Sequence, residues 1–154
     1  MLEGQHFQNA YVTRDVTKAI AAFRARAQID RLFEYEGATA VMTPQGPTTL
    51  HTKLAFIWIG GLQYELIQPS GDGASVYQDA LPNDDSLAFH HICVRVESWA
   101  DFRDRVEQQP YPVVLEGGSD ALRFLYLDTR ALLGHYVEYT WMTDALWAQV
   151  GGGK

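Results

Sequence analysis

Four side chains of the kinds that bind divalent cations occupy matched places in the two halves of this sequence. They are an amide, an imidazole and two carboxylates, carried by Gln8, His91, Glu65 and Glu138. Gln8 and His91 each lie seven residues before a residue that can cap a helix. Glu65 and Glu138 each lie four residues after a glycine. Nitrogen and oxygen donors of these types suit a borderline or hard divalent ion, and the carboxylates could also shuttle a proton.

The elements that carry these side chains follow the same order, β-α-β-β-β, in both halves. A strand at 6–13 leads to a helix capped by Asp15. A strand at 90–97 leads to a helix capped by Ser98. Three further strands are expected in each half, at 31–36, 54–59 and 62–68 in the first and at 112–116, 122–127 and 135–141 in the second. The repeat predicts an eight-stranded α+β domain.

The sequence predicts a single domain over residues 1–154. Module one covers about 6–69, a Gly-, Asp- and Pro-rich linker about 70–87, module two about 88–142, and a C-terminal tail 143–154. The connection 37–51 is rich in Thr, Pro and Gly and predicts a long loop that covers a site.

Side-chain alternation indicates which face of the sheet the candidate ligands share. In the strand around 91–96, Ile92, Val94 and Val96 suit a face packed against a helix. His91 and Arg95 then lie on the other face, together with Cys93, which we interpret as a packing residue. The same reasoning places Glu65 and Glu138 on the face away from the helices. That face becomes a cleft if the sheet curls.

Composition excludes several classes of protein. The chain has 12 Lys and Arg against 19 Asp and Glu, a net charge of −7, which argues against nucleic acid or anionic lipid as a partner. The single cysteine excludes an internal disulfide and any multi-cysteine metal cage. There is neither a long apolar run nor a signal-like start, so no membrane association and a cytoplasmic location are expected.

Three segments together resemble the vicinal oxygen chelate superfamily of glyoxalases, methylmalonyl-CoA epimerase, extradiol dioxygenases and bleomycin-resistance proteins. They are FHHICVRV at 89–96, GLQYELIQP at 61–69 and GHYVEYTWM at 134–142, and the resemblance extends from about His6 to Met142. It implies two βαβββ modules that form a curved, barrel-like mixed sheet around a cleft. It also implies a divalent metal, Zn²⁺, Ni²⁺, Co²⁺ or Mn²⁺, held by Gln8, Glu65, His91 and Glu138.

The resemblance further implies roles in catalysis. Glu138 or Glu65 would be the base that takes a proton next to vicinal substrate oxygens, while the metal stabilises the enolate or enediolate. Arg95, on the cleft face, could hold an anionic group of the substrate. A homodimer acting on a small molecule is expected by the same resemblance. His6 is the alternative to Gln8, because it lies two residues earlier on the same strand face.

Three functions compete at this point. The first is a metal-dependent lyase, isomerase or epimerase of the glyoxalase-like kind, which the four matched side chains favour. The second is a metal-free protein that sequesters a hydrophobic compound, as in the bleomycin-resistance branch, in line with the 12% aromatic content. The third is an iron-dependent extradiol dioxygenase, which needs two histidines and one carboxylate and would require His6 in place of Gln8.

Overall fold

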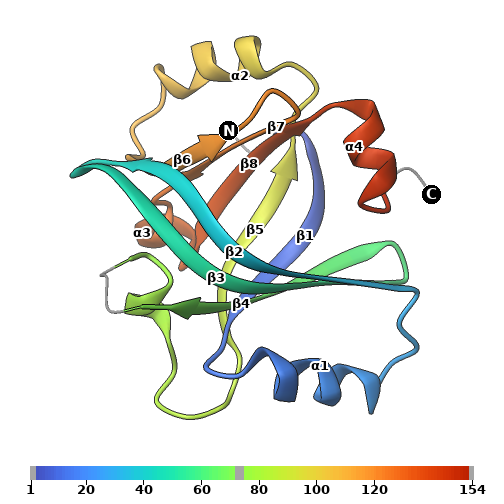
Figure 1. Cartoon of the computed structure of the whole chain (residues 1–154). Helices are drawn as coiled ribbons and strands as arrows, with labels where there is room; N and C mark the ends of the chain where they lie inside the picture. Colours follow the sequence, from blue (N-terminus) through green and yellow to red (C-terminus); the bar gives the residue numbers. More distant parts are fainter. Residues whose placement is uncertain (1–2, 72–74, 153–154) are drawn as a thin grey trace.

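The computed structural model describes residues 3–71 and 75–152, and this part of the chain contains eight strands. They are β1 Gln5–Val12, β2 Arg31–Thr43, β3 Gly46–Ile59, β4 Leu62–Ser70, β5 Ala88–Arg95, β6 Val113–Gly118, β7 Leu122–Leu127 and β8 Tyr136–Met142. They close into a barrel in the order β1-β4-β3-β2-β6-β7-β8-β5 (Figure 1). The predicted α+β fold, two βαβββ modules forming a barrel-like mixed sheet, is confirmed.

Short helices connect and cover the strands. They are α1 Val16–Arg24, the 3-10 helix η1 Gln78–Ala80, α2 Trp99–Val106, α3 Arg130–Leu133 and α4 Asp144–Gln149. The two predicted caps are confirmed. The Asp15 carboxylate accepts a hydrogen bond from the backbone N–H of Lys18, and the Ser98 hydroxyl accepts one from that of Asp101.

Helices α1 and α2 pack on opposite sides of the barrel (Figure 1). Ile20 of α1 is buried with Ile57 and Leu66 on the outer face of β3 and β4. Phe102 of α2 is buried with Val137 and other residues on the outer face of β5, β7 and β8. Because these apolar rows alternate with the candidate ligands, packing of the helices turns the ligands toward the barrel interior.

The prediction of a long loop at 37–51 is wrong. These residues extend β2 and β3 into one long hairpin, whose two-residue turn at Pro44 and Gln45 joins Thr43 to Gly46. Threonine-rich sequence favours a strand because β-branched side chains fit a pleated surface. The extension pairs Val41 with Gly117 of β6 and thereby closes the barrel.

The predicted linker lies between β4 and β5, and its residues 72–74 are outside the described residues. Its described part contains η1 and Tyr77, which is buried against the barrel core. The predicted tail contains α4, whose Trp147 packs against Phe7 and Trp58. Among the described residues, no helix is long and apolar enough to cross a membrane.

Candidate metal centre

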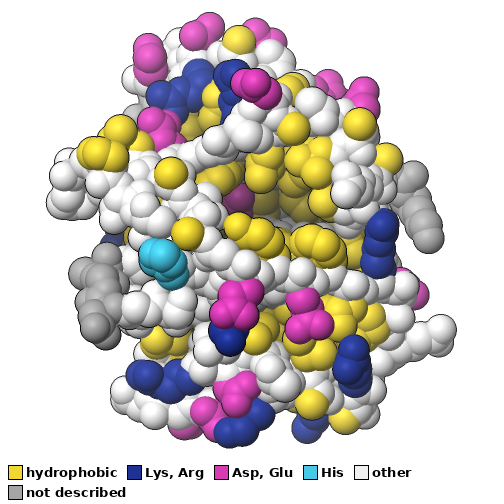
Figure 2. Space-filling model, viewed as in Figure 1, with side chains coloured by type: hydrophobic (Ala, Val, Ile, Leu, Met, Phe, Trp, Pro, Cys, Tyr) yellow, Lys and Arg dark blue, Asp and Glu magenta, His cyan; other side chains and the backbone are white. Residues whose placement is uncertain are grey.

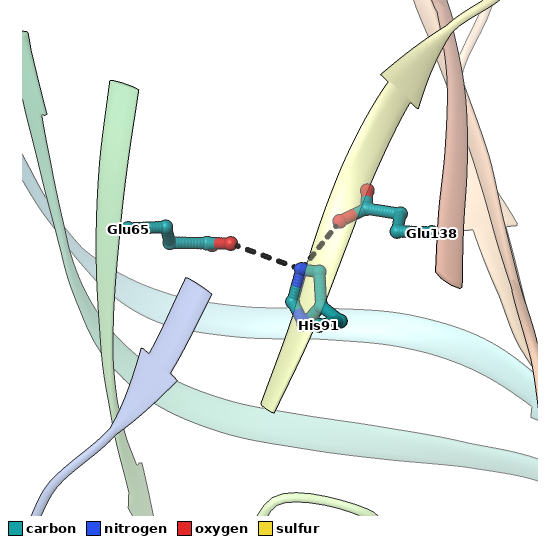
Figure 3. A group of neighbouring side chains, drawn as sticks. All are labelled: Glu65, His91 and Glu138. Carbon is teal, nitrogen blue, oxygen red and sulfur yellow. Dashed lines mark ion pairs between the residues drawn. The ribbon is translucent and has the colours of Figure 1, made fainter. Parts of the chain in front are cut away.

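Glu65, His91 and Glu138 meet inside the barrel. One carboxylate oxygen of Glu138 lies 2.9 Å from Nε2 of His91, and one of Glu65 lies 3.5 Å from the same nitrogen (Figure 3). One ligand atom from each of the three residues lies within 4.8 Å of the others. The strand register explains the meeting, because Ala10 of β1 pairs with Glu65 on β4 and with His91 on β5.

A β-bulge shapes the strand that carries His91. Ala10 pairs with His91 and Tyr11 with Phe89, so His90 is an extra residue in β5. A bulge breaks the alternation of faces. Both imidazoles are therefore buried, with their Nδ1 atoms 2.8 Å apart. Regular alternation would place His90 and His91 on opposite faces, and the bulge explains why the two rings meet.

The hydrogen bonds of His90 keep Nδ1 of His91 protonated in both the neutral and the charged ring. The carbonyl oxygen of Val76 can only accept, so Nε2 of His90 donates to it at 3.0 Å. Nδ1 of neutral His90 then accepts the hydrogen bond from Nδ1 of His91. Nε2 of His91 is left facing the carboxylates of Glu65 and Glu138. This arrangement matches metal sites in which the second ring nitrogen of a ligating histidine donates a hydrogen bond that orients the ring.

Burial and charge move the pKa values of these groups in different directions. Burial acts to lower the pKa of His91, but hydrogen bonds and charge from Glu138 and Glu65 outweigh it and raise the pKa to about 9. Burial, followed by the charge of His91, lowers the pKa of His90 to about 3. Burial raises the pKa of Glu65 despite its contact with His91. The cluster thus holds a proton on His91 that a bound cation would replace.

Gln8 lines the same cavity as Glu65 and Glu138, whereas His6 does not. A second bulge explains the difference, because His6 pairs with Val94 and Gln8 with Cys93, leaving Phe7 as an extra residue. His6 is exposed and its Nε2 contacts Asn9 Oδ1 at 2.9 Å. The alternation that placed His6 and Gln8 on one face is interrupted between them.

The amide of Gln8 has one oxygen without a partner. Its Nε2 donates to Oε1 of Gln63 at 2.6 Å, which fixes the orientation of the amide group. Its Oε1 is buried and has no hydrogen-bond partner within the described structure. A buried acceptor without a partner costs free energy, so such an atom indicates a missing donor or cation.

The structure does not bring Arg95 to this group. Its guanidinium lies 4.7 Å from the ring centroid of Trp147 and 3.4 Å from Oδ1 of Asp144, and Arg95 does not line the cavity. The expectation that it points into the cleft fails because β5 ends at Arg95, where the side chain reaches α4. Cys93 does face the interior, where burial first and then the nearby carboxylates raise the pKa of its thiol. The thiol therefore stays protonated and packs with Phe7.

Two tyrosines at the site were missed by the sequence analysis. Tyr126 of β7 places its hydroxyl 3.5 Å from Nε2 of His91 and 2.7 Å from the hydroxyl of Tyr77. Burial, with the nearby acidic groups, raises the pKa of both phenols well above the usual value. Both remain neutral hydrogen-bond donors at physiological pH. Alternation in 122–127 could have indicated Tyr126, but nothing in the linker sequence marks Tyr77.

The cluster opens onto a cavity of about 650 Å³. Glu65, Glu138 and Tyr126 line it together with apolar side chains of β2, β3 and β7, among them Phe33 and Phe56. Figure 2 shows a hollow edged by hydrophobic side chains, with an acidic side chain visible inside it. A few polar groups within an apolar cavity are typical of small-molecule sites.

Solved structures with the same fold include epimerases. Methylmalonyl-CoA epimerase from Mycobacterium tuberculosis is similar with a TM-score of 0.66 and 14% identity, over 93% of this chain and 91% of that one. Hypothetical protein BH1468 from Bacillus halodurans C-125 gives 0.65 and 14%, over 92% and 96%. Streptomyces coelicolor methylmalonyl-CoA epimerase in complex with 2-nitronate-propionyl-CoA gives 0.64 and 13%, over 92% and 96%. No family model and no curated protein matches the chain. At this identity the likeness is one of fold.

Proposed function

We propose, on the premise that this chain has the vicinal oxygen chelate fold, that it is a metal-dependent lyase, isomerase or epimerase. Its substrate would be a small molecule with vicinal oxygens, from which a proton is removed at the adjacent carbon. The observation that carries this proposal is the cluster of Glu65, His91 and Glu138 at the cavity, in which Nδ1 of His91 donates to His90 and Nε2 faces the carboxylates.

The donor set fits a divalent cation. Oε1 of Gln8 is buried without a partner, and Nε2 of His91 faces two carboxylates. We propose Gln8, Glu65, His91 and Glu138 as the ligands of Zn²⁺, Ni²⁺, Co²⁺ or Mn²⁺. The cation would act as a Lewis acid that stabilises negative charge on the substrate oxygens.

The two carboxylates are placed to move the proton. Both line the cavity, and they approach His91 from two sides (Figure 3). A substrate carbon next to them can lose its proton to Glu65 or Glu138, and the same carboxylate can return it. Delivery of a proton by the other carboxylate to the opposite face of the carbon inverts its configuration, whereas return by the same carboxylate to a neighbouring carbon isomerises the substrate.

Tyr126 can support this step by hydrogen bonding. Tyr126 lines the cavity, and the hydrogen bond with Tyr77 fixes the position of its hydroxyl. A neutral, pre-oriented donor stabilises an oxyanion more than an equivalent donor in water does, because no reorganisation is needed during the reaction.

Metal binding and proton exchange test the proposal. We expect one divalent ion per chain by calorimetric titration of the purified protein with Zn²⁺, Ni²⁺, Co²⁺ or Mn²⁺. The metal-loaded protein should exchange the carbinol C–H proton of acetoin, a small hydroxyketone, for deuterium in D₂O. The variant His91→Asn should lose both properties, and His51→Asn, changed on the exposed part of β3, should lose neither. Absence of stoichiometric metal and of exchange would contradict the proposal.

A sequestering protein is the second candidate, because the apolar cavity would also suit it. Thermal denaturation separates the two functions. Stabilisation by Zn²⁺, Ni²⁺ or Mn²⁺ supports the metal-dependent enzyme, whereas stabilisation by hydrophobic compounds alone supports sequestration.

A further inference from the structure

The cavity offers few positive charges to a ligand. Of the described side chains that line it, Arg31 is the only lysine or arginine, and it is an exposed residue at the start of β2. Glu65 and Glu138 contribute negative charge inside the same cavity. Recognition of phosphate groups generally uses clustered arginine and lysine side chains or helix N-termini. The charges that line this cavity therefore disfavour a phosphorylated ligand.

The walls of the cavity are rich in aromatic rings. Phe33 of β2 stacks on Phe56 of β3 with 6.2 Å between ring centroids, and Phe7 stacks on Trp58 at 6.4 Å. All four rings line the cavity. Phe33 is 58% exposed although it is large and apolar. A ring left exposed at the wall of a cavity is positioned to be covered by a ligand rather than by the protein core.

The acidic groups and the stacked phenyl rings of the cavity come from different strands. Glu65 of β4 and Glu138 of β8 lie with Tyr126 at the cluster, whereas Phe33 and Phe56 stack on β2 and β3, which also contribute the polar side chains of Arg31, Thr39 and Thr52. The volume of about 650 Å³ is enough for a body of two rings beside the polar cluster. A ligand that satisfies both parts has oxygens at one end and an apolar ring system at the other.

We propose that the substrate is an uncharged compound with an aromatic body and two vicinal oxygens, and not a phosphorylated thioester. The inference that the substrate has vicinal oxygens rests on the proposed function, whereas the inference of an aromatic body rests on the cavity walls alone. Benzoin, whose carbinol carbon bears a hydrogen, a hydroxyl and a phenyl ring and is bonded directly to a phenyl ketone, is a probe of this class. Acetoin is the comparison compound that has the same oxygens without the rings. Coenzyme A is the comparison compound that carries phosphates.

The reaction on the probe balances without a further reactant. The carbinol C–H bond of benzoin breaks, its proton passes to the carboxylate of Glu65 or Glu138, and the electron pair moves to the carbonyl oxygen. Return of a solvent deuteron to either carbon face restores the ketone. Deuterated, racemised benzoin is the product in D₂O.

Binding to the metal-free protein tests the aromatic body separately from the chemistry. With EDTA present, benzoin should quench the part of the tryptophan fluorescence that comes from Trp58, a cavity residue, at concentrations at least about tenfold below those at which acetoin does. Coenzyme A should not compete with benzoin. Phe33→Ala should weaken benzoin binding about tenfold, since the ring is exposed and its loss leaves the fold intact. Phe89→Ala, which removes a ring that is 44% exposed on β5 and outside the cavity, is the matched control.

Each outcome bears on one of the two proposals. Coenzyme A competing as well as benzoin, or Phe33→Ala binding benzoin unchanged, would overturn the proposed substrate class. Deuterium exchange into acetoin without binding of benzoin would overturn it as well, while leaving the metal-dependent function standing. Binding of benzoin with no exchange into either compound after metal loading would support the aromatic body and overturn the enzymatic function.

Discussion

The two βαβββ modules hold equivalent side chains but build different parts of the site. In module one, β2 and β3 have 13 and 14 residues, whereas β6 and β7 of module two have 6 residues each. The long hairpin carries Phe33 and Phe56 of the cavity wall and also closes the barrel. Module two carries His91 and the adjacent His90. The repeat thus positions the chemistry, and the unequal hairpins shape the space beside it.

The first strands of the modules differ in a second way. They pair with each other, and each has a bulge, at Phe7 in β1 and at His90 in β5. The bulge in β1 turns Gln8 inward and leaves His6 outside. The bulge in β5 turns two histidines inward, so that one can orient the other. A single extra residue in each strand therefore keeps His6 out of the barrel interior in one module and brings His90 into it in the other.

The largest expected effect comes from replacing either of the two equivalent carboxylates by an amide. Glu65→Gln and Glu138→Gln preserve volume, so they serve as controls for each other. Loss of a general base typically costs about 10²- to 10⁴-fold in rate, and we expect the deuterium exchange of the base variant to fall by that amount. The variant in which exchange falls most while one metal ion still binds identifies the base, with calorimetry measuring the metal. Full exchange in both variants would contradict a catalytic role for either carboxylate.

The adjacent histidines predict how stability depends on pH. The folded pKa of His91 is about 9, above its ordinary 6.5, so its stabilisation is complete below pH 6.5 and is lost as pH rises through 9. We expect the Tm of the EDTA-treated protein to fall over this range, with a loss on the order of a few kcal/mol. The pKa of His90 is about 3, so its contribution to stability changes between pH 3 and 6.5. This range does not overlap the range in which the contribution of His91 is lost.

A control variant and a metal sharpen this prediction. His91→Asn should flatten the fall in Tm above pH 6.5. Stabilisation by Zn²⁺ should grow over the same range, because the metal binds unprotonated imidazole. A Tm that is flat from pH 6.5 to 9 in the unchanged protein would contradict the ion pairs between His91 and the carboxylates.

The sequence predicted the elements of this fold better than the details of its site. Periodicity and caps indicated both modules, because apolar rows and Asp15 or Ser98 are local signals. The bulges at Phe7 and His90 have no such signal, since one extra residue changes the facing without changing composition. Alternation predicted that Arg95 lies in the cleft. This prediction failed because alternation does not indicate where a strand ends relative to a cavity. The extension of the hairpin was predicted as a loop because Thr, Pro and Gly occur both in loops and in this strand pair.

The partner of His91 gives a smaller expected effect. His90→Leu removes the acceptor for Nδ1 of His91 while filling a similar volume. Loss of such an orienting partner commonly weakens metal binding by about 10- to 100-fold, and we expect this change in the calorimetric Kd for Zn²⁺. His51→Leu on β3 removes a histidine outside the cavity and should leave the Kd unchanged. Equal affinities in the two variants would show that His90 does not position the ligand.

The smallest expected effects come from the equivalent helix caps of the two modules. Asp15→Ala and Ser98→Ala each remove one acceptor for a backbone N–H at the start of α1 or α2. Each should lower the free energy of unfolding by about 1 kcal/mol, which corresponds to a fall in Tm of roughly 2–4 °C for a chain of this length. Thermal denaturation measures both. Because α1 and α2 pack outside the barrel, the Kd for Zn²⁺ should not change, and a weaker Kd in one variant would show that its helix supports the interior of its own module.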